Sequence, residues 1–136
     1  MESKFVQINY TSYDIRRAHD CLRTDHQSFL MTLSREEDPE CHPFWYCQLL
    51  KAFSIDVHFC PGGVSSSKET MEVLWVHWLG INPDHKWGFR HCALPKIGFV
   101  PKDSDSPAFG FLDPSLVIHG CHLIPAFVDG CTDHLL

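Results

Sequence analysis

Three polar side chains have the types and spacing that acid–base chemistry requires. Asp56 and His58 are two residues apart in a stretch of alternating polarity, so a β-strand would place them on one face. His77 lies in the next such stretch, and a hairpin would bring it across from them. A base oriented by a third group activates a serine or cysteine nucleophile. These three residues are the catalytic candidates for a small hydrolytic enzyme, although a wet polar face with cross-strand contacts is the commoner origin of such a group.

Wider motif searches favour a protein without catalytic activity. The sequence contains no nucleophile elbow, no glycine-rich phosphate loop and no metal-binding helix motif. Structural zinc needs ligands in tight local pairs such as Cys-x2-Cys, and that spacing is absent. The nearest approaches are Cys41-His42 with Cys47, and His119 with Cys121 and His122. We therefore expect no metal site and no cofactor, and we interpret the seven cysteines as mostly reduced, buried side chains.

Aromatic residues are the stronger candidates for a binding site. Phe44, Tyr46 and Trp75 fall on strand faces opposite to the expected core faces, and Trp87 follows a turn at 82–84. Exposed aromatic rings near carboxylates suit a cage for a methylated lysine or a flat patch for a protein partner. The alternative is that the segment 11–25 or the last strand covers this second face.

Basic residues define a nucleic-acid alternative. They are Arg16, Arg17, Arg23, Lys86 and Arg90, with Lys96 and Lys102 nearby in the sequence. The net charge of −6 argues against a nucleic-acid surface spread over the whole chain. If these residues gathered on one side, they would give a contact that weakens with salt.

A long hairpin is expected to position most of these residues. Odd-numbered residues of Phe44–Phe59 are apolar with the single exception of Lys51, which predicts a strand with one buried face. Met71–Gly80 alternates in the same way, with Leu74, Val76 and Trp78 on one face and Val73, Trp75 and His77 on the other. The glycine- and serine-rich segment between them predicts a long loop, so Trp45 and Trp78 are expected to pack in the core.

The remaining chain predicts short strands and irregular loops. Strands are expected at 4–10, 27–33, 87–94, 97–100 and 119–127, an irregular crossing at 11–25, a solvated acidic turn at 35–40, an exposed loop at 102–107 and one helical turn at 115–118 capped by Ser115 or Asp113. With 136 residues, this predicts a single all-β domain over 1–136, a small SH3-like barrel with loose ends at 1–4 and 129–136.

Hydropathy bears on location. The sequence has no apolar run long enough for a membrane helix, and no signal peptide precedes the first predicted strand. We expect an intracellular protein, nuclear or cytoplasmic, without a membrane partner.

Several segments resemble a module of fungal transposon-derived proteins, found C-terminal to the transposase core or free-standing. They are Tyr13–Arg17, His42–Tyr46, Val73–Trp78 and the ending Phe109–Phe127, within a resemblance from about Phe5 to about Thr132. The module usually has arginine where this chain has His119 and Cys131, which implies a lost or weakened contact if those arginines touch a partner. The resemblance implies a mobile-element origin and no particular activity.

A second resemblance is to bromo-adjacent homology (BAH) domains, which are chromatin-associated protein-interaction modules. It is carried by Phe29-Leu30-Met31, Trp45–Phe53, Val73–Trp78 followed by Asn82-Pro83, and Ile118–Ile124. It implies a BAH-like variant of the SH3-like barrel, and a protein partner such as a basic histone-like tail.

Three hypotheses follow. A non-catalytic binding module for protein or chromatin predicts that Trp75 and Tyr46 lie together in a groove lined by carboxylates. An accessory nucleic-acid-binding module of a mobile element predicts a contiguous basic face. A small hydrolytic enzyme predicts a pocket with a hydrogen bond between histidine and aspartate.

Overall fold

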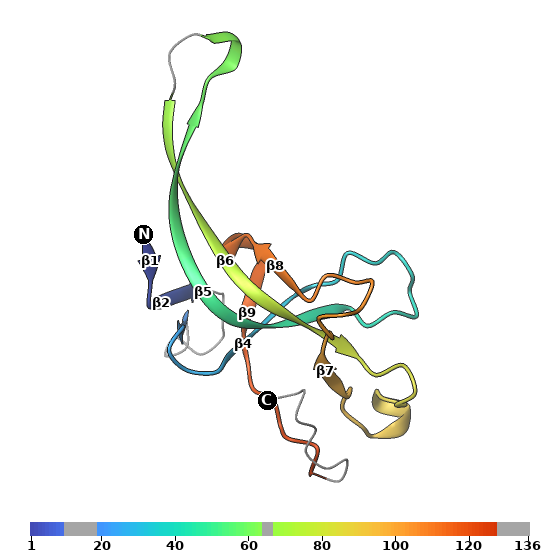
Figure 1. Ribbon diagram of the computed structural model, residues 1–136. Coiled ribbons are helices and arrows are strands. Elements are labelled where there is room, and N and C mark those ends of the chain that lie inside the picture. Colours follow the sequence, from blue (N-terminus) through green and yellow to red (C-terminus); the bar gives the residue numbers. More distant parts are fainter. Residues whose placement is uncertain (10–18, 64–66, 128–136) are drawn as a thin grey trace.

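The predicted hairpin is the centre of the fold. The computed structural model describes residues 1–9, 19–63 and 67–127. Strands β5 (Phe44–Phe59) and β6 (Ser67–Ile81) pair antiparallel, from Tyr46 opposite Leu79 to Phe59 opposite Ser67 (Figure 1). Both strands are confirmed. β6 begins four residues earlier than predicted, because its first four residues are polar and the alternation of apolar residues could not reveal them.

A β-bulge divides this hairpin into two parts with different exposure. The register shifts between Leu49, opposite Val76, and Lys51, opposite Trp75, so Leu50 is an extra residue on β5. Before the bulge the odd-numbered Cys47 and Leu49 are fully buried, whereas beyond it the even-numbered Ala52 is buried. The prediction of one buried odd-numbered face along β5 was therefore wrong beyond Leu49. We call the face with Leu49, Ala52 and Leu74 the inner face and its opposite the outer face.

Other strands extend the sheet on both sides of the hairpin. β4 (Ser28–Leu33) pairs with β5, and β9 (Val117–Cys121) pairs with β4. β7 (Ile97–Phe99) and β8 (Phe109–Leu112) both pair with β6, and β1 (Glu2–Ser3) pairs with β5. Among the described residues no pairing joins β8 to β9, which are connected by the 3-10 turn η4 (Pro114–Leu116).

The strand content matches the expected fold class. The large sheet has the order β7-β6-β5-β4-β9, with β8 paired to β6 and β1 paired to β5 off this path. The described helical segments are short 3-10 turns. The prediction of an all-β fold with irregular loops and only short helical turns is confirmed.

A separate ribbon closes one side of the molecule. β2 (Phe5–Asn9) and β3 (His19–Arg23) form a two-stranded sheet. The backbone N–H of Gly120 in β9 donates to Asp20 Oδ2 at 2.8 Å, which ties the ribbon to the sheet. The predicted irregular segment 11–25 is thus a strand over His19–Arg23, since it pairs residue by residue with β2. Residues 10–18 lie outside the described part.

The core lies on the inner face of the sheet and beneath this ribbon. Its buried members come from β2, β4, β5, β6, β8 and β9 and are Ile8, Leu30, Cys47, Leu49, Ala52, Leu74, Val76, Leu112 and Val117. Trp78 packs partly buried against them, as predicted for the inner face of β6. None of these residues lies beyond Ala52 on β5 or before Leu74 on β6.

The end of the hairpin that lies beyond the core consequently projects as an arm, which we define as residues 53–59 and 67–73 (Figure 1). On its outer face Phe53 pairs with Val73 and Ile55 with Met71. On its inner face the pairs are polar: Ser54 with Glu72, Asp56 with Thr70 and His58 with Lys68. The arm is an amphipathic two-stranded ribbon.

The connections are mostly as predicted. The backbone N–H of Asp84 donates to Asn82 Oδ1 at 2.9 Å in the expected turn, and residues 35–40 and 102–107 are exposed. The helical turn is η4, one residue earlier than expected, and Asp113 is its cap because Oδ1 accepts the Ser115 N–H at 2.9 Å.

Two predicted strands need correction. Residues 87–94 contain the 3-10 turn η3 (Phe89–His91) in place of a strand, since Gly88 and Cys92 have positive φ angles of 98° and 47°. The last strand, β9, begins at Val117 and ends at Cys121, well short of 127. The described 3-10 turns all fall short of the length and hydrophobicity that a membrane-crossing helix needs.

Candidate functional site

The structure separates the three catalytic candidates. Asp56 lies opposite Thr70 on the arm, whereas His77 lies opposite Gln48 in the body of the sheet. Asp56 Oδ2 contacts Lys68 Nζ at 2.9 Å and Oδ1 accepts from Thr70 Oγ1 at 2.9 Å. The Lys68 hydrogen bond, helped by that of Thr70, lowers the pKa of Asp56. The expectation that His77 faces Asp56 and His58 is wrong, because the strand register places it nearer the opposite end of the hairpin.

His77 is instead part of a stack of rings. Its imidazole lies between Phe99, at 4.5 Å between ring centroids, and Phe109, at 4.4 Å, with interplanar angles of 25° and 23°. The Nε2 atom is 3.1 Å from the carbonyl oxygen of Val100, which orients the ring when that nitrogen carries the proton. The environment of His77 therefore resembles an aromatic packing position more than that of a catalytic base.

This stack continues into a longer aromatic row on the outer face. The ring centroid of Trp75 lies 5.9 Å from that of Phe109, with an interplanar angle of 9°, and 4.7 Å from that of Phe111, with an angle of 53°. The row consists of Phe99, His77, Phe109, Trp75 and Phe111, from β7, β6 and β8. The Lys102 ammonium lies 5.7 Å from the centroid of the Phe109 ring, within reach of a cation–π contact. Phe111 is 68% exposed, so the row ends on open surface.

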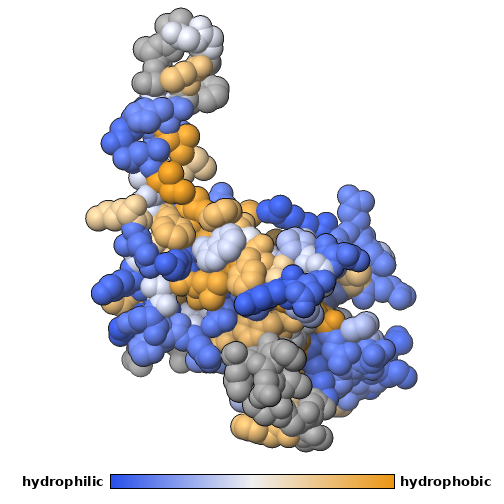
Figure 2. Space-filling model, in the orientation of Figure 1, coloured by the Kyte–Doolittle hydropathy of each residue, from blue (hydrophilic) through white to orange (hydrophobic). Residues whose placement is uncertain are grey.

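The same outer face stays apolar along the arm. Beyond Trp75 the next pairs are Val73 with Phe53 and Met71 with Ile55, and both Met71 and Ile55 are exposed. Figure 2 shows hydrophobic surface on the arm and on the body next to it, bordered by hydrophilic surface. Among the described residues, side chains of β7 and β8 flank His77 and Trp75 on this face, and the arm leaves Met71 and Ile55 exposed. Most of the segment 11–25 that was expected to cover the face lies outside the described residues.

A groove adjoins the row on the side of β8. Its cavity of about 390 Å³ lies between the end of β4 and the β8–η4–β9 segment. Trp45 and Trp78 line it, edge to face at 6.0 Å, together with the exposed Leu33, Phe111 and Leu116. We call it the tryptophan groove. Phe111 belongs both to this groove and to the aromatic row, so the two surfaces are continuous.

Sequence patterns missed the tryptophan groove. Trp45 and Trp78 are on the inner face as predicted, but the open side between β8 and β9 leaves both half-buried. Leu33, Phe111 and Leu116 carry no motif. The available signal was the placement of Leu33 at a strand end and of Leu116 beside the Asp113-Pro114 turn, where apolar residues have few neighbours to cover them.

Three of the four aromatic candidates surround His42 instead of an open cage. The His42 ring stacks on Tyr46 at 5.5 Å and meets the edges of Phe44 at 5.9 Å and Trp87 at 4.6 Å. Its Nε2 atom is 2.9 Å from the Tyr46 hydroxyl, and its Nδ1 atom is buried without a partner. Burial lowers the pKa of His42 and raises that of Tyr46.

The expected groove containing both Trp75 and Tyr46 is therefore wrong. Tyr46 lies opposite Leu79 and packs with His42, whereas Trp75 lies opposite Lys51 and packs with Phe109 and Phe111. A side chain of this chain already occupies the space among Phe44, Tyr46 and Trp87.

The described basic residues do not form one patch. Arg23 donates from Nε to Asp25 Oδ1 at 2.8 Å, and its guanidinium lies 5.3 Å from the centroid of Phe5. Lys86 and Arg90 are exposed in the loop between β6 and β7, on the opposite side of the molecule from the β2–β3 ribbon (Figure 1). Arg16 and Arg17 lie outside the described residues.

The cysteines divide into buried and exposed groups. Burial raises the pKa of Cys47 to about 12 and that of the half-buried Cys121 to about 11. Cys21, Cys60 and Cys92 are exposed, so the prediction of mostly buried thiols was wrong for these three, which lie on the ribbon, the hairpin loop and the loop after β6. Within 1–9, 19–63 and 67–127, no group of three or more metal-ligating side chains is close enough to hold an ion.

Comparisons with protein-family models, with curated proteins and with solved structures gave no match. The aromatic row and the tryptophan groove are thus candidates on their geometry and chemistry alone.

Proposed function

We propose that the chain is a non-catalytic protein-binding module that binds its partner on the aromatic row and the adjoining tryptophan groove. One observation carries the proposal: three large apolar residues remain at the surface around one groove. Leu33 is 64% exposed, Phe111 68% and Leu116 43%. Scattered apolar residues on a surface need no explanation, but a contiguous group beside two tryptophans is typical of an interaction site.

The composition of this surface suits protein recognition. Aromatic side chains dominate the energetically important centres of protein interfaces because they bury a large area at a small cost in rotamer entropy. The rings of the aromatic row are already held by mutual contacts, so a partner would not have to order them. Trp75 and Phe111, 4.7 Å apart, would form the centre of the interface.

Charge favours a basic partner. The chain carries a net charge of −6, which attracts positively charged segments over distances of about a Debye length. The position of Lys102 over Phe109 indicates that the row accepts a cation against its rings. A basic histone-like tail is accordingly the first class of partner to test, which would make the module chromatin-associated.

The proposal is tested by titrating the protein with unmethylated and lysine-methylated histone-tail peptides while recording tryptophan fluorescence. We expect Trp75→Ala and Phe111→Ser each to weaken peptide binding by about tenfold, as for a residue at the centre of an interface. Phe111→Ser replaces a mostly exposed side chain and leaves the core intact. Trp87→Ala is the matched control, since it removes a tryptophan from the His42 cluster and none from the row.

Two results would overturn the proposal. One is equal affinity in Trp75→Ala, Phe111→Ser and the unaltered protein. The other is that no peptide binds while short duplex DNA does, with an affinity that falls steeply with salt. That result would indicate the accessory nucleic-acid-binding module.

A further inference from the structure

A second cavity lies on the other face of the hairpin, beneath the root of the arm. It has a volume of about 210 Å³ and is bounded by β1 and β2 on one side and by β5 and β6 on the other. Its apolar lining includes the buried Ala52 and Leu74 and the half-buried Val6 and Pro114. Because Ala52 and Leu74 belong to the inner face, the cavity is separate from the aromatic row.

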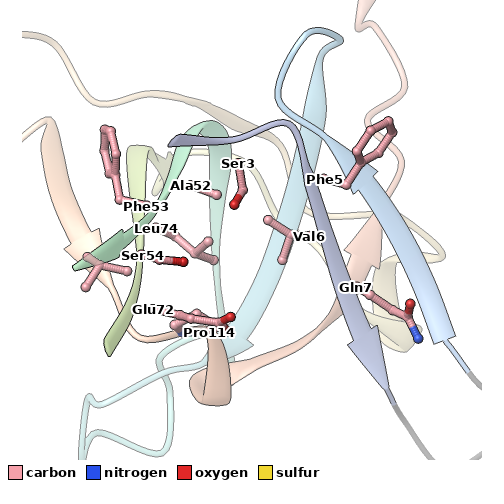
Figure 3. Close-up of a pocket in the computed structure, with 11 residues that line it drawn as sticks. Ser3, Phe5, Val6, Gln7, Ala52, Phe53, Ser54, Glu72, Leu74 and Pro114 are labelled. Carbon is pink, nitrogen blue, oxygen red and sulfur yellow. The ribbon is translucent and has the colours of Figure 1, made fainter. Parts of the chain in front are cut away.

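Polar groups line the same cavity. Strand alternation places Ser54 and Glu72 on the inner face next to Ala52 and Leu74, and Ser3 lies across from them on β1. Figure 3 shows Val6 directed toward the β5–β6 hairpin and Glu72 beside Pro114 at one end of the cavity. Phe5 and Gln7 project to the far side of β2 in that view.

Size and chemistry together limit what this cavity can hold. Sites for small-molecule ligands usually enclose roughly 300–1,000 Å³, so a cavity of about 210 Å³ suits one side chain better than a whole ligand. Glu72 is the one charged residue in the lining, and two serine hydroxyls accompany it. An apolar floor with a carboxylate at its edge fits a group that has a hydrocarbon stem and a cationic head.

We infer that this cavity receives a single arginine or lysine side chain of a protein partner. The stem packs on Val6, Leu74 and Pro114. The head group donates to the Glu72 carboxylate, and the hydroxyls of Ser3 and Ser54 accept its remaining hydrogens. The inference rests on the proposed function in that the side chain belongs to a bound protein, and it adds a second contact on the face of the hairpin opposite the aromatic row.

The expected strength is modest. Glu72 is exposed, so water screens its attraction for a cation, and a surface ion pair of this kind changes affinity by only about twofold to fivefold. A single amino-acid derivative is therefore expected to bind weakly, which NMR spectroscopy measures well.

The test follows the methyl signals of Ala52, Val6 and Leu74 by NMR during titration with N-acetyl-arginine amide and N-acetyl-lysine amide. N-acetyl-citrulline amide is the neutral counterpart of the arginine probe. We expect the two cationic probes to shift these methyl signals and the citrulline probe to bind several-fold more weakly. Glu72→Gln should weaken the binding of the cationic probes by about twofold to fivefold.

Glu69→Gln is the matched control variant. Glu69 is an exposed carboxylate on the same strand, but it lies opposite Val57 on the outer face of the arm. Binding in this variant should equal that of the unaltered protein. Equal binding of citrulline and arginine probes, equal loss in both variants, or unshifted methyl signals would each overturn the inference.

The methyl signals of Ala52, Val6 and Leu74 report on the cavity and not on the aromatic row, which lies on the other face. Failure of the cavity test with successful peptide binding at Trp75 would leave the proposed function intact. Success here with no peptide bound at Trp75 would retain the cation pocket and remove the aromatic row as a docking surface.

Discussion

The Trp78 indole lies so close to the backbone of Gly110 that no side chain fits at position 110. A Cβ atom on Gly110 would be 2.8 Å from Nε1 of the indole, a distance that real Cβ contacts do not reach. The indole is itself confined, since it packs against the core and meets Trp45 edge to face. This contact positions one wall of the tryptophan groove.

We therefore expect Gly110→Ala to lower the free energy of unfolding by about 1–3 kcal/mol, the usual cost of overpacking. Urea unfolding followed by tryptophan fluorescence measures it. Gly80→Ala on β6 is the control, because its nearest atom would be Val100 Cγ2 at an ordinary 3.8 Å. Equal stability of the two variants would show that the Trp78 ring moves freely.

Single residues of the site were predictable where strand period alone places them. Period-2 alternation assigned Tyr46 and Trp75 to the outer face and Trp78 to the inner face, and the structure agrees. It did not show that His42 occupies the space among Phe44, Tyr46 and Trp87. One of the ring contacts brings Trp87, in the loop between β6 and β7, against His42, which precedes β5. The local sequence does not indicate that these two segments meet.

At the scale of elements, the hairpin was predictable and its bulge was hidden. Lys51 is the only polar residue in the odd-numbered series of β5, and it directly follows the extra residue Leu50. A period count cannot distinguish one exception from a change of face, because the odd residues after Lys51 remain apolar. Those residues, such as Ile55, lie on the exposed outer face of the arm.

The arm should be separable from the rest of the fold. Every buried core residue lies outside 55–71. We expect a variant in which an Asn-Gly turn replaces 55–71, joining Ser54 to Glu72, to fold with a melting temperature within a few degrees of the full chain. Circular dichroism and thermal unfolding measure this. A loss of cooperative unfolding would mean that the arm helps to order the core.

At the scale of the whole molecule, the β2–β3 ribbon covers the edge strand β9. The Asp20 carboxylate accepts the Gly120 N–H, and Leu22 lies against Gly120, where a Cβ atom would be 2.8 Å from its Cδ2. This covering was not predictable, because it joins residues 100 positions apart and requires a strand in a segment without a clear period.

We expect Asp20→Ala to lower the free energy of unfolding by about 1.5 kcal/mol, the lower end for a hydrogen bond to a charged group, because this bond is only partly buried. Hydrogen exchange at the Gly120 amide should rise with it. Asp25→Ala is the control: it removes the exposed pair with Arg23, worth about 0–1 kcal/mol. Unchanged exchange at Gly120 in Asp20→Ala would show that the ribbon does not hold β9.

The arm has a consequence for experiments at high concentration. Within the described residues, Met1 hydrogen-bonds the backbone of Ser54, but no strand pairs with the arm beyond Ser54 on β5 or before Leu74 on β6, so both edges keep backbone groups open to another chain. Such edges associate by mass action. The Asp56–Lys68 ion pair on the arm's inner face has no net charge, so it adds little repulsion between two arms. Self-association that grows with protein concentration and salt would thus originate at the arm edges, and dilute samples separate it from partner binding.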